Sequence, residues 1–197
     1  FTIKENLKCD RIRYEHLKSS GFVSVDRGEL RMILDVGRLG PNYLLAHAHA
    51  DTLSFELSIG KQRIFVNSGT SNYGSDARRG FERSTRAHNT VEVDNCSSSE
   101  VWSTFRVARR AFPFGLKISE SNECLIVKCS HDGYKRLKGS PIHTRKWIFE
   151  KEKIIIKDKI FGLFNTALCR FILHPEVTIS KQNSQIYILT APNNIRM

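Results

Sequence analysis

The chain has 197 residues, of which 40% are hydrophobic and 26% charged, and this fits one globular domain with a substantial core. Its 12 phenylalanines, 12 glycines and 5 prolines exclude disordered, collagen-like and low-complexity proteins. No stretch reaches the roughly 20 apolar residues that span a bilayer. The net charge of +11 favours a polyanionic partner, namely an acidic polysaccharide, an anionic lipid or a nucleic acid.

Short apolar runs bounded by turn residues dominate the sequence and predict β-strands nearly throughout. The exception is Lys4–Lys18, whose weak helical spacing makes it the one helical candidate. Turns at Gly60-Lys61 and at Glu150–Glu152 predict two hairpins. The expected strands are Leu30–Val36, Leu53–Ile59, Arg63–Asn67, Thr90–Val93, Trp102–Phe112, Leu125–Cys129, Thr144–Phe149, Lys153–Ile160, Ala167–Leu173 and Gln185–Thr190. We therefore expect an all-β, layered antiparallel β-sandwich that forms a single domain over residues 1–197.

The densest chemical signal is a run that places two histidines two residues apart, between small alanines. In an extended strand, His47, His49 and Asp51 would project from one face. Two imidazoles at this spacing can chelate Zn²⁺ with His88 from a neighbouring strand, or they can form a hydrogen-bonded structural pair. The other histidines are expected at the surface or in turns: His16, His131, His143 and His174.

The polar segment Gly69–His88 predicts a long arginine-rich loop, and such loops in compact sheet proteins often carry function. Arginine suits bidentate contacts to carboxylate or sulfate, although salt bridges of Arg83 and Arg86 with nearby carboxylates are the alternative. Nucleic acid is the competing polyanion. The sequence lacks RNP-like aromatic motifs, helix-turn-helix patterns and zinc-finger spacing, so we predict no nucleic-acid partner.

The run His47–Leu57 resembles the signature of the heparinase II/III-like C-terminal domain, and further motifs follow it in the family's order. These are Ile64–Thr70, Tyr73, Arg78, Arg83–Val91, Ser99–Trp102 and Phe105-Arg106, within an ordered match from Gly21 to Ala111. The resemblance implies a supersandwich-like fold and the C-terminal domain of a polysaccharide lyase. Its substrate would be a glycosaminoglycan, alginate or bacterial acidic polysaccharide. The resemblance also implies an N-terminal helical toroid domain in the full-length protein, and we expect this chain, which starts at Phe1, to be a fragment without it.

The resemblance further implies a structural zinc ion held by His49, Asn67 and His88. The family usually has Asp at the position of Asn67, and an amide oxygen is a weaker ligand than a carboxylate. Asp51 therefore stays open as the completing ligand, or as an acceptor that orients His49.

By the same resemblance, His47 and Tyr73 reach the cleft and are the candidate catalytic residues; the alternatives are that His47 braces the zinc ligands and that Tyr73 packs a loop. Arg78 and Arg83 are the candidates for clamping the charge of the acidic substrate. Such lyases act by β-elimination, in which a base removes the C5 proton and an acid protonates the departing O4. Because their principal catalytic residues lie in the helical domain, we expect this chain alone to be inactive. The alternatives are a non-catalytic acidic-glycan-binding module and a uronyl C5-epimerase. We also expect a periplasmic or secreted bacterial protein without a membrane span, and we leave a homo-oligomer open.

Overall fold

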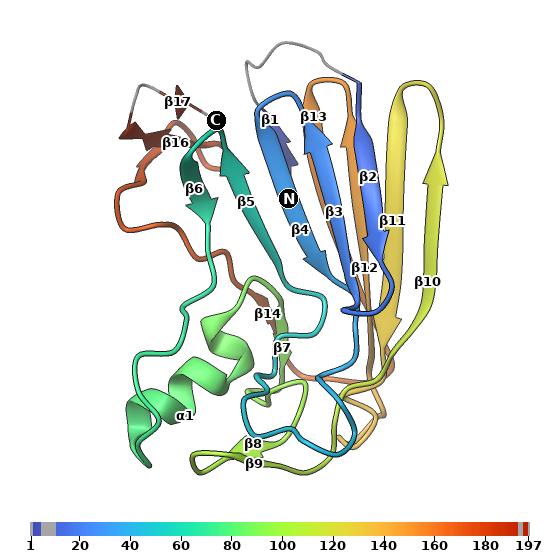
Figure 1. Ribbon diagram of the computed structural model, residues 1–197, viewed down its shortest axis with the longest axis vertical. Coiled ribbons are helices and arrows are strands. Elements are labelled where there is room, and N and C mark those ends of the chain that lie inside the picture. Colours follow the sequence, from blue (N-terminus) through green and yellow to red (C-terminus); the bar gives the residue numbers. More distant parts are fainter. Residues whose placement is uncertain (1, 5–10, 193–194, 197) are drawn as a thin grey trace.

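Two five-stranded antiparallel sheets packed face to face form the body of the molecule (Figure 1). The computed structural model describes residues 2–4, 11–192 and 195–196. The first sheet contains, in spatial order, β1 (Thr2–Lys4), β13 (Lys153–Phe161), β12 (Ile142–Glu150), β11 (Cys124–His131) and β10 (Pro113–Glu120). The second contains β2 (Arg13–Leu17), β3 (Phe22–Arg27), β4 (Leu30–Asp35), β5 (Phe55–Ile59) and β6 (Gln62–Phe65). The expected all-β antiparallel sandwich is confirmed.

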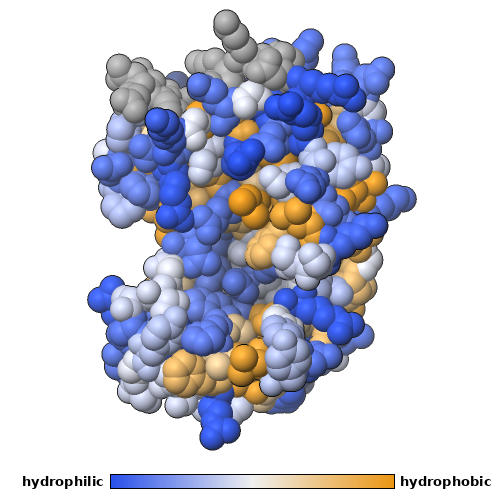
Figure 2. Space-filling view, in the orientation of Figure 1, coloured by the Kyte–Doolittle hydropathy of each residue, from blue (hydrophilic) through white to orange (hydrophobic). Residues whose placement is uncertain are grey.

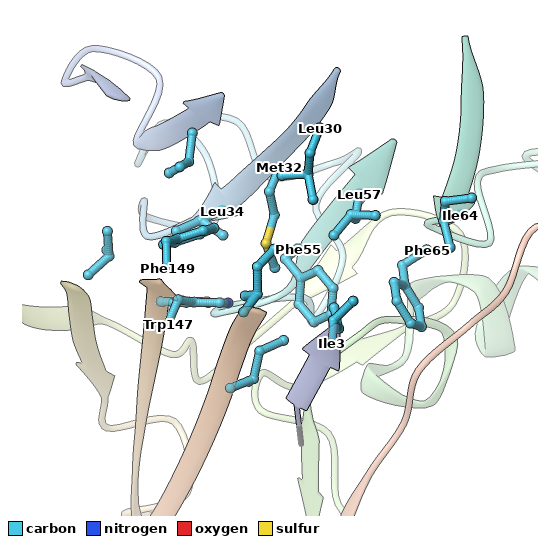
Figure 3. Packing of buried hydrophobic residues seen from close by; sticks show 14 of the residues in the cluster. Ile3, Leu30, Met32, Leu34, Phe55, Leu57, Ile64, Phe65, Trp147 and Phe149 are labelled. Atoms are coloured by element: carbon cyan, nitrogen blue, oxygen red, sulfur yellow. The ribbon is translucent and has the colours of Figure 1, made fainter. Parts of the chain in front are cut away.

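The core forms between the inner faces of the two sheets because apolar residues alternate along their strands. On β4, Leu30, Met32 and Leu34 are fully buried while the residues between them are exposed. They face the side of the first sheet that carries Trp147 and Phe149 (Figure 3). Each such side chain contributes about 1.5–3 kcal/mol on burial, so this layer fixes the register of both sheets.

Smaller elements lie beyond the ends of the two sheets. Around the lower end in Figure 1 are α1 (Ala77–Arg83), η1 (Thr85–Ala87), β7 (Val91–Val93) paired with β14 (Ala167–Cys169), and β8 (Val101–Trp102) paired with β9 (Arg106–Val107). A separate sheet holds β15 (Thr178–Lys181), β16 (Tyr187–Ala191) and β17 (Ile195–Arg196). No helix in the described ranges is long and apolar enough to cross a membrane.

Both predicted hairpins are confirmed, since β5 pairs with β6 around Gly60 and β12 pairs with β13 around residues 151–152. The predicted helix at Lys4–Lys18 was wrong. The described part of that range holds β1 and β2, and β2 pairs antiparallel with β3. The expected long strand at Trp102–Phe112 is also absent from the described chain, because Ser103 adopts φ +50° and leaves only the short strands β8 and β9.

Candidate functional site

Residues 46–54 form turns, so the prediction that three side chains of this run share one strand face was wrong. The two histidines point to different neighbours. His49 contacts the ring of His88, whereas His47 contacts the ring of Tyr73. The turn therefore directs His49 into a buried pair with His88 and leaves His47 at the surface.

Residues 46–54 are held in place from α1, η1 and β12. The backbone N–H of Ala50 donates to the carbonyl of Arg83 at 2.8 Å, and Thr85 Oγ1 donates to the carbonyl of Ala50 at 2.6 Å. Leu53 adopts φ +63°, and its carbonyl accepts a hydrogen bond from Arg145 Nη1 at 2.8 Å. A buried polar scaffold thus fixes a segment that has no strand pairing of its own.

The pair His49–His88 forms the centre of the site. His49 Nδ1 and His88 Nε2 lie 3.2 Å apart, with the rings edge to face. His88 Nδ1 donates to the carbonyl of Ser84 at 2.7 Å, which leaves Nε2 as an acceptor. His49 Nδ1 can donate to it, and His49 Nε2 can accept from Arg79 Nη1 at 3.3 Å. The donors and acceptors therefore form one consistent chain.

Both histidines of this pair are neutral at pH 7. Burial lowers the pKa of His49 to about 4, and the neighbouring charges of Arg79 and Arg83 add to that effect while Asp51 opposes it. Burial also lowers the pKa of His88 to about 4. Neutral imidazole is the form that ligates metals, so this environment leaves the two rings competent to bind one.

The geometry of the pair suits two ligands of one zinc ion. Nitrogens on a tetrahedral ion with Zn–N bonds of about 2.0–2.1 Å lie roughly 3.3 Å apart, close to the 3.2 Å observed between His49 and His88. Asn67 and His88 line one cavity, although Asn67 Oδ1 accepts from the N–H of Gly69 at 2.7 Å. Among residues 2–4, 11–192 and 195–196, no three His, Cys, Asp or Glu side chains are placed to hold a metal. The structure therefore brings two of the three predicted ligands, His49 and His88, together and places Asn67 on the same cavity as His88.

A cavity of about 550 Å³ lies on the outer face of the second sheet, beside the histidine pair. Figure 2 shows a hollow between the strands and the α1 end, with hydrophilic residues along its floor. Asp35 and Asp51 are among its lining residues. Burial raises the pKa of Asp51 to about 6, and burial together with the charge of Asp51 raises that of Asp35 well above its usual value.

An exposed cluster of aromatic rings lies next to the His49–His88 pair. The ring of His47 lies 5.3 Å from that of Tyr73 and 5.8 Å from that of Phe105, edge-on to both. Tyr73 and Phe105 stack at 5.9 Å and are 55% and 44% exposed. The two predicted catalytic residues, His47 and Tyr73, thus meet at the surface of the molecule.

The two arginines predicted to bind substrate have other partners. Arg78 is mostly exposed and bonds to Glu82 through Nε at 3.1 Å. Arg83 is buried, and its guanidinium donates to the carbonyls of Ala48, Trp102, Ser103 and Arg106 at 3.0–3.2 Å. Arg83 is therefore a structural residue that joins α1 to two neighbouring loops, and we do not retain it as a substrate ligand.

The sequence reasoning passed over Arg79, the residue that contacts the histidine pair. Its guanidinium carbon lies 5.2 Å from the centre of the Tyr73 ring, and Nη1 reaches both Thr70 and His49. Arg79 lies one helical turn before Arg83 on α1. Because this segment was predicted to be a loop, nothing in the sequence indicated that Arg79 would lie near the histidines.

A second buried polar cluster lies behind the site, in the first sheet. The expectation that His131 and His143 are surface histidines was wrong, since both are fully buried. His131 Nε2 lies 3.2 Å from His143 Nδ1, and His143 Nε2 lies 2.7 Å from Asp158 Oδ1. Burial and the neighbouring arginines keep the pKa of His131 well below its usual value.

Comparisons with known proteins agree with this architecture. A family model described as "Heparinase II/III-like, C-terminal" matches residues 11–197. A mutant of heparan sulfate lyase HepC from Pedobacter heparinus matches with a TM-score of 0.68 and 18% identity, over 95% of this chain and 28% of that one. The product of the heparinase III gene BT4657 matches with a TM-score of 0.65 and 18% identity, over 92% and 27%. At these identities the likeness shows a shared fold, and the chain spans little more than a quarter of either protein. No curated protein matches.

Proposed function

This chain belongs to the heparinase II/III-like, C-terminal family, and we propose that it is the C-terminal domain of a lyase that cleaves uronic-acid-containing polysaccharides by β-elimination. The main support for this proposal is the contact of His47 with the exposed ring of Tyr73, next to the neutral pair His49–His88. An N-terminal helical domain of the same protein would supply the opposite wall of the cleft. The positive net charge suits an acidic chain, and such a substrate implies a periplasmic or secreted enzyme.

The proposed chemistry assigns proton transfer to the surface pair. A base removes the proton at C5 of the uronic acid, the C4–O4 bond breaks as a C4–C5 double bond forms, and an acid returns a proton to O4. His47 and Tyr73 carry the group types that do this work, and they lie within 5.3 Å of each other, measured between ring centres. They would act on one sugar from the side of the β domain.

We also propose that His49, His88 and Asn67 hold a zinc ion. The 3.2 Å separation of the two imidazole nitrogens and their neutral state support this assignment. When bound, the ion would stabilise the junction between residues 46–54 and η1. The two rings then hold the adjacent His47 at the edge of the cleft.

The lyase proposal is tested on the full-length protein with a panel of uronic polysaccharides. Cleavage produces unsaturated uronic ends, which give new ultraviolet absorbance. Tyr73→Phe removes only the hydroxyl and should lower kcat by roughly 100-fold or more. Tyr43→Phe is the matched control, because Tyr43 is 88% exposed and lies outside the aromatic cluster, and it should leave kcat unchanged.

Two outcomes would contradict the proposal. No absorbance change with any uronic polysaccharide would remove the lyase assignment. Incorporation of solvent deuterium at C5 without chain cleavage would instead identify an epimerase, since both reactions begin with the same proton removal.

A further inference from the structure

Arg79 is a buried arginine whose charge has no anionic partner among residues 2–4, 11–192 and 195–196. Its side chain lies on α1 with 1% exposure, and Nη1 donates to Thr70 Oγ1 at 3.2 Å and contacts His49 Nε2 at 3.3 Å. Its Nε and Nη2 are buried and have no hydrogen-bond partner within the described chain. Burying an arginine without a carboxylate is costly, so a residue of this kind calls for an explanation.

The two unpaired nitrogens form the edge with which other arginines of this protein hold carboxylates. Arg145 uses Nε and Nη2 to bind the two oxygens of Asp158 at 2.7 and 2.9 Å. Arg109 uses the same two atoms for Glu100, at 2.8 and 2.5 Å. This planar pair of N–H groups matches two oxygens of a carboxylate or sulfate. Arg79 presents that edge with no acceptor from residues 11–192 on it.

A purely structural role does not account for this arrangement. Arg83, four residues on, is equally buried, and its guanidinium nitrogens are all taken up by backbone carbonyls. Arg79 has its single engaged nitrogen, Nη1, turned to the histidine pair and Thr70. The bidentate edge remains for a ligand.

The aromatic residues around Arg79 indicate that the anionic group it binds belongs to a sugar. The ring of Tyr73 lies over the guanidinium at 5.2 Å and stacks on Phe105, and both rings are about half exposed. Aromatic faces of this kind pack against the C–H groups of sugar rings. Because the Tyr73 ring lies over the guanidinium, a ligand that binds this edge must displace the ring.

We propose that Arg79 binds one oxyanion of an acidic sugar, either a carboxylate or a sulfate ester, while Tyr73 and Phe105 contact the sugar ring. The choice of a sugar rests on the lyase function proposed above. The anion site itself rests on the two unpaired nitrogens of Arg79.

The experiment observes the Nε–H resonance of Arg79 by ¹H–¹⁵N NMR while three probes are titrated. Glucuronate carries a carboxylate, glucose 6-sulfate carries a sulfate ester, and glucose carries neither. We expect a saturable shift with at least one acidic probe and none with glucose. The acidic probe that saturates identifies the anion. Absence of a shift with both acidic probes would overturn the proposal.

Variants assign the resonance and supply the control. Arg79→Gln should abolish the response, and in the full-length enzyme it should raise KM by roughly 10- to 100-fold. Arg63→Gln, at a half-exposed arginine on β6 outside the proposed sites, should change neither. Should Arg79→Gln fail to fold, Arg79→Lys keeps the charge but loses the planar edge, and it should still raise KM. A folded Arg79 variant that keeps the wild-type KM would contradict the site.

The two proposals can fail separately. A saturable Arg79 response in a protein that cleaves no uronic polysaccharide would leave the anion site and remove the lyase. Cleavage by an enzyme whose Arg79 resonance ignores both acidic probes would leave the lyase and remove the site.

Discussion

Arg145 on β12 lies directly opposite Asp158 on β13, and its guanidinium reaches past this partner to the functional loops. Nη1 donates to the carbonyl of Leu53 at 2.8 Å and to that of Asn89 at 2.5 Å. Leu53 ends the turn that carries His49, and Asn89 follows His88. One buried arginine therefore ties the first sheet to both segments of the histidine pair.

Arg145→Met should destabilise the protein by about 3 kcal/mol, because it leaves the Asp158 carboxylate without its cationic partner and two carbonyls without their donor. The pKa of Asp158 is held below its usual value by the charge of Arg145 and by hydrogen bonds, against the effect of burial. Urea denaturation at pH 7 measures the loss. Lys157→Met, an exposed neighbour of Asp158, is the control and should change stability little. Equal stability of the Arg145 variant and the wild type would refute this account.

The pairing of Arg145 with Asp158 was within reach of sequence reasoning. The turn after Glu150 was predicted, and a tight hairpin there sets the register that places these two residues opposite each other. An arginine at an inward position of an apolar strand is itself a signal of a buried ion pair. The strands of this hairpin were predicted well because burial alternates over all nine residues of β12 and over the first four of β13.

The loops could not be predicted in the same way. Local alternation suggested a strand for His47–Asp51, but the conformation depends on distant donors such as Thr85 and Arg145. The helix α1 was missed because it is only seven residues long and buries charged side chains in place of an apolar face. The contact of His49 with His88 was predicted from the family resemblance, whereas the contact of Arg79 with His49 became evident only in the structure.

Stability should fall as the pH drops from about 6.5 toward 5. His131 and His143 are fully buried, and burial lowers the pKa of each below the unfolded value of about 6.5. The unfolded chain therefore binds protons first, and each histidine costs up to about 1.4 kcal/mol per pH unit in this window. His49 and His88, whose pKa values burial lowers to about 4, act in the same direction. Asp51, whose pKa is raised to about 6, and Asp35, whose pKa is raised well above its usual value, have the opposite sign. Urea titrations at several pH values measure the sum.

A variant isolates the histidine contribution. His131→Gln should show a shallower loss of stability between pH 6.5 and 5 than the wild type, while Asp51 contributes equally to both. His174→Gln, at a partly exposed histidine, is the matched control and should keep the wild-type slope. Identical slopes in all three proteins would show that His131 does not titrate on unfolding.

Asn67→Asp should tighten zinc binding, because a carboxylate is a stronger ligand than an amide oxygen. Zinc content by mass spectrometry and competition with a chelator measure the affinity. His49→Ala and His88→Ala should each remove the metal and lower the Tm. Asp51→Asn distinguishes the remaining ligand: unchanged zinc affinity supports Asn67, whereas loss of zinc would assign Asp51. Zinc content unaffected by His49→Ala would refute the site.

His47→Ala should lower kcat of the full-length enzyme by roughly 100-fold while leaving the fold intact. Its ring contacts only the exposed cluster of Tyr73 and Phe105 among the described aromatic residues, so little packing depends on it. Thermal unfolding and metal content should match the wild type, in contrast to His49→Ala. His16→Ala, on the edge strand β2, is the control for loss of an imidazole far from the cluster. A fall in Tm or zinc content with His47→Ala would show that His47 braces the metal ligands, and unchanged kcat would remove it from the proton transfer.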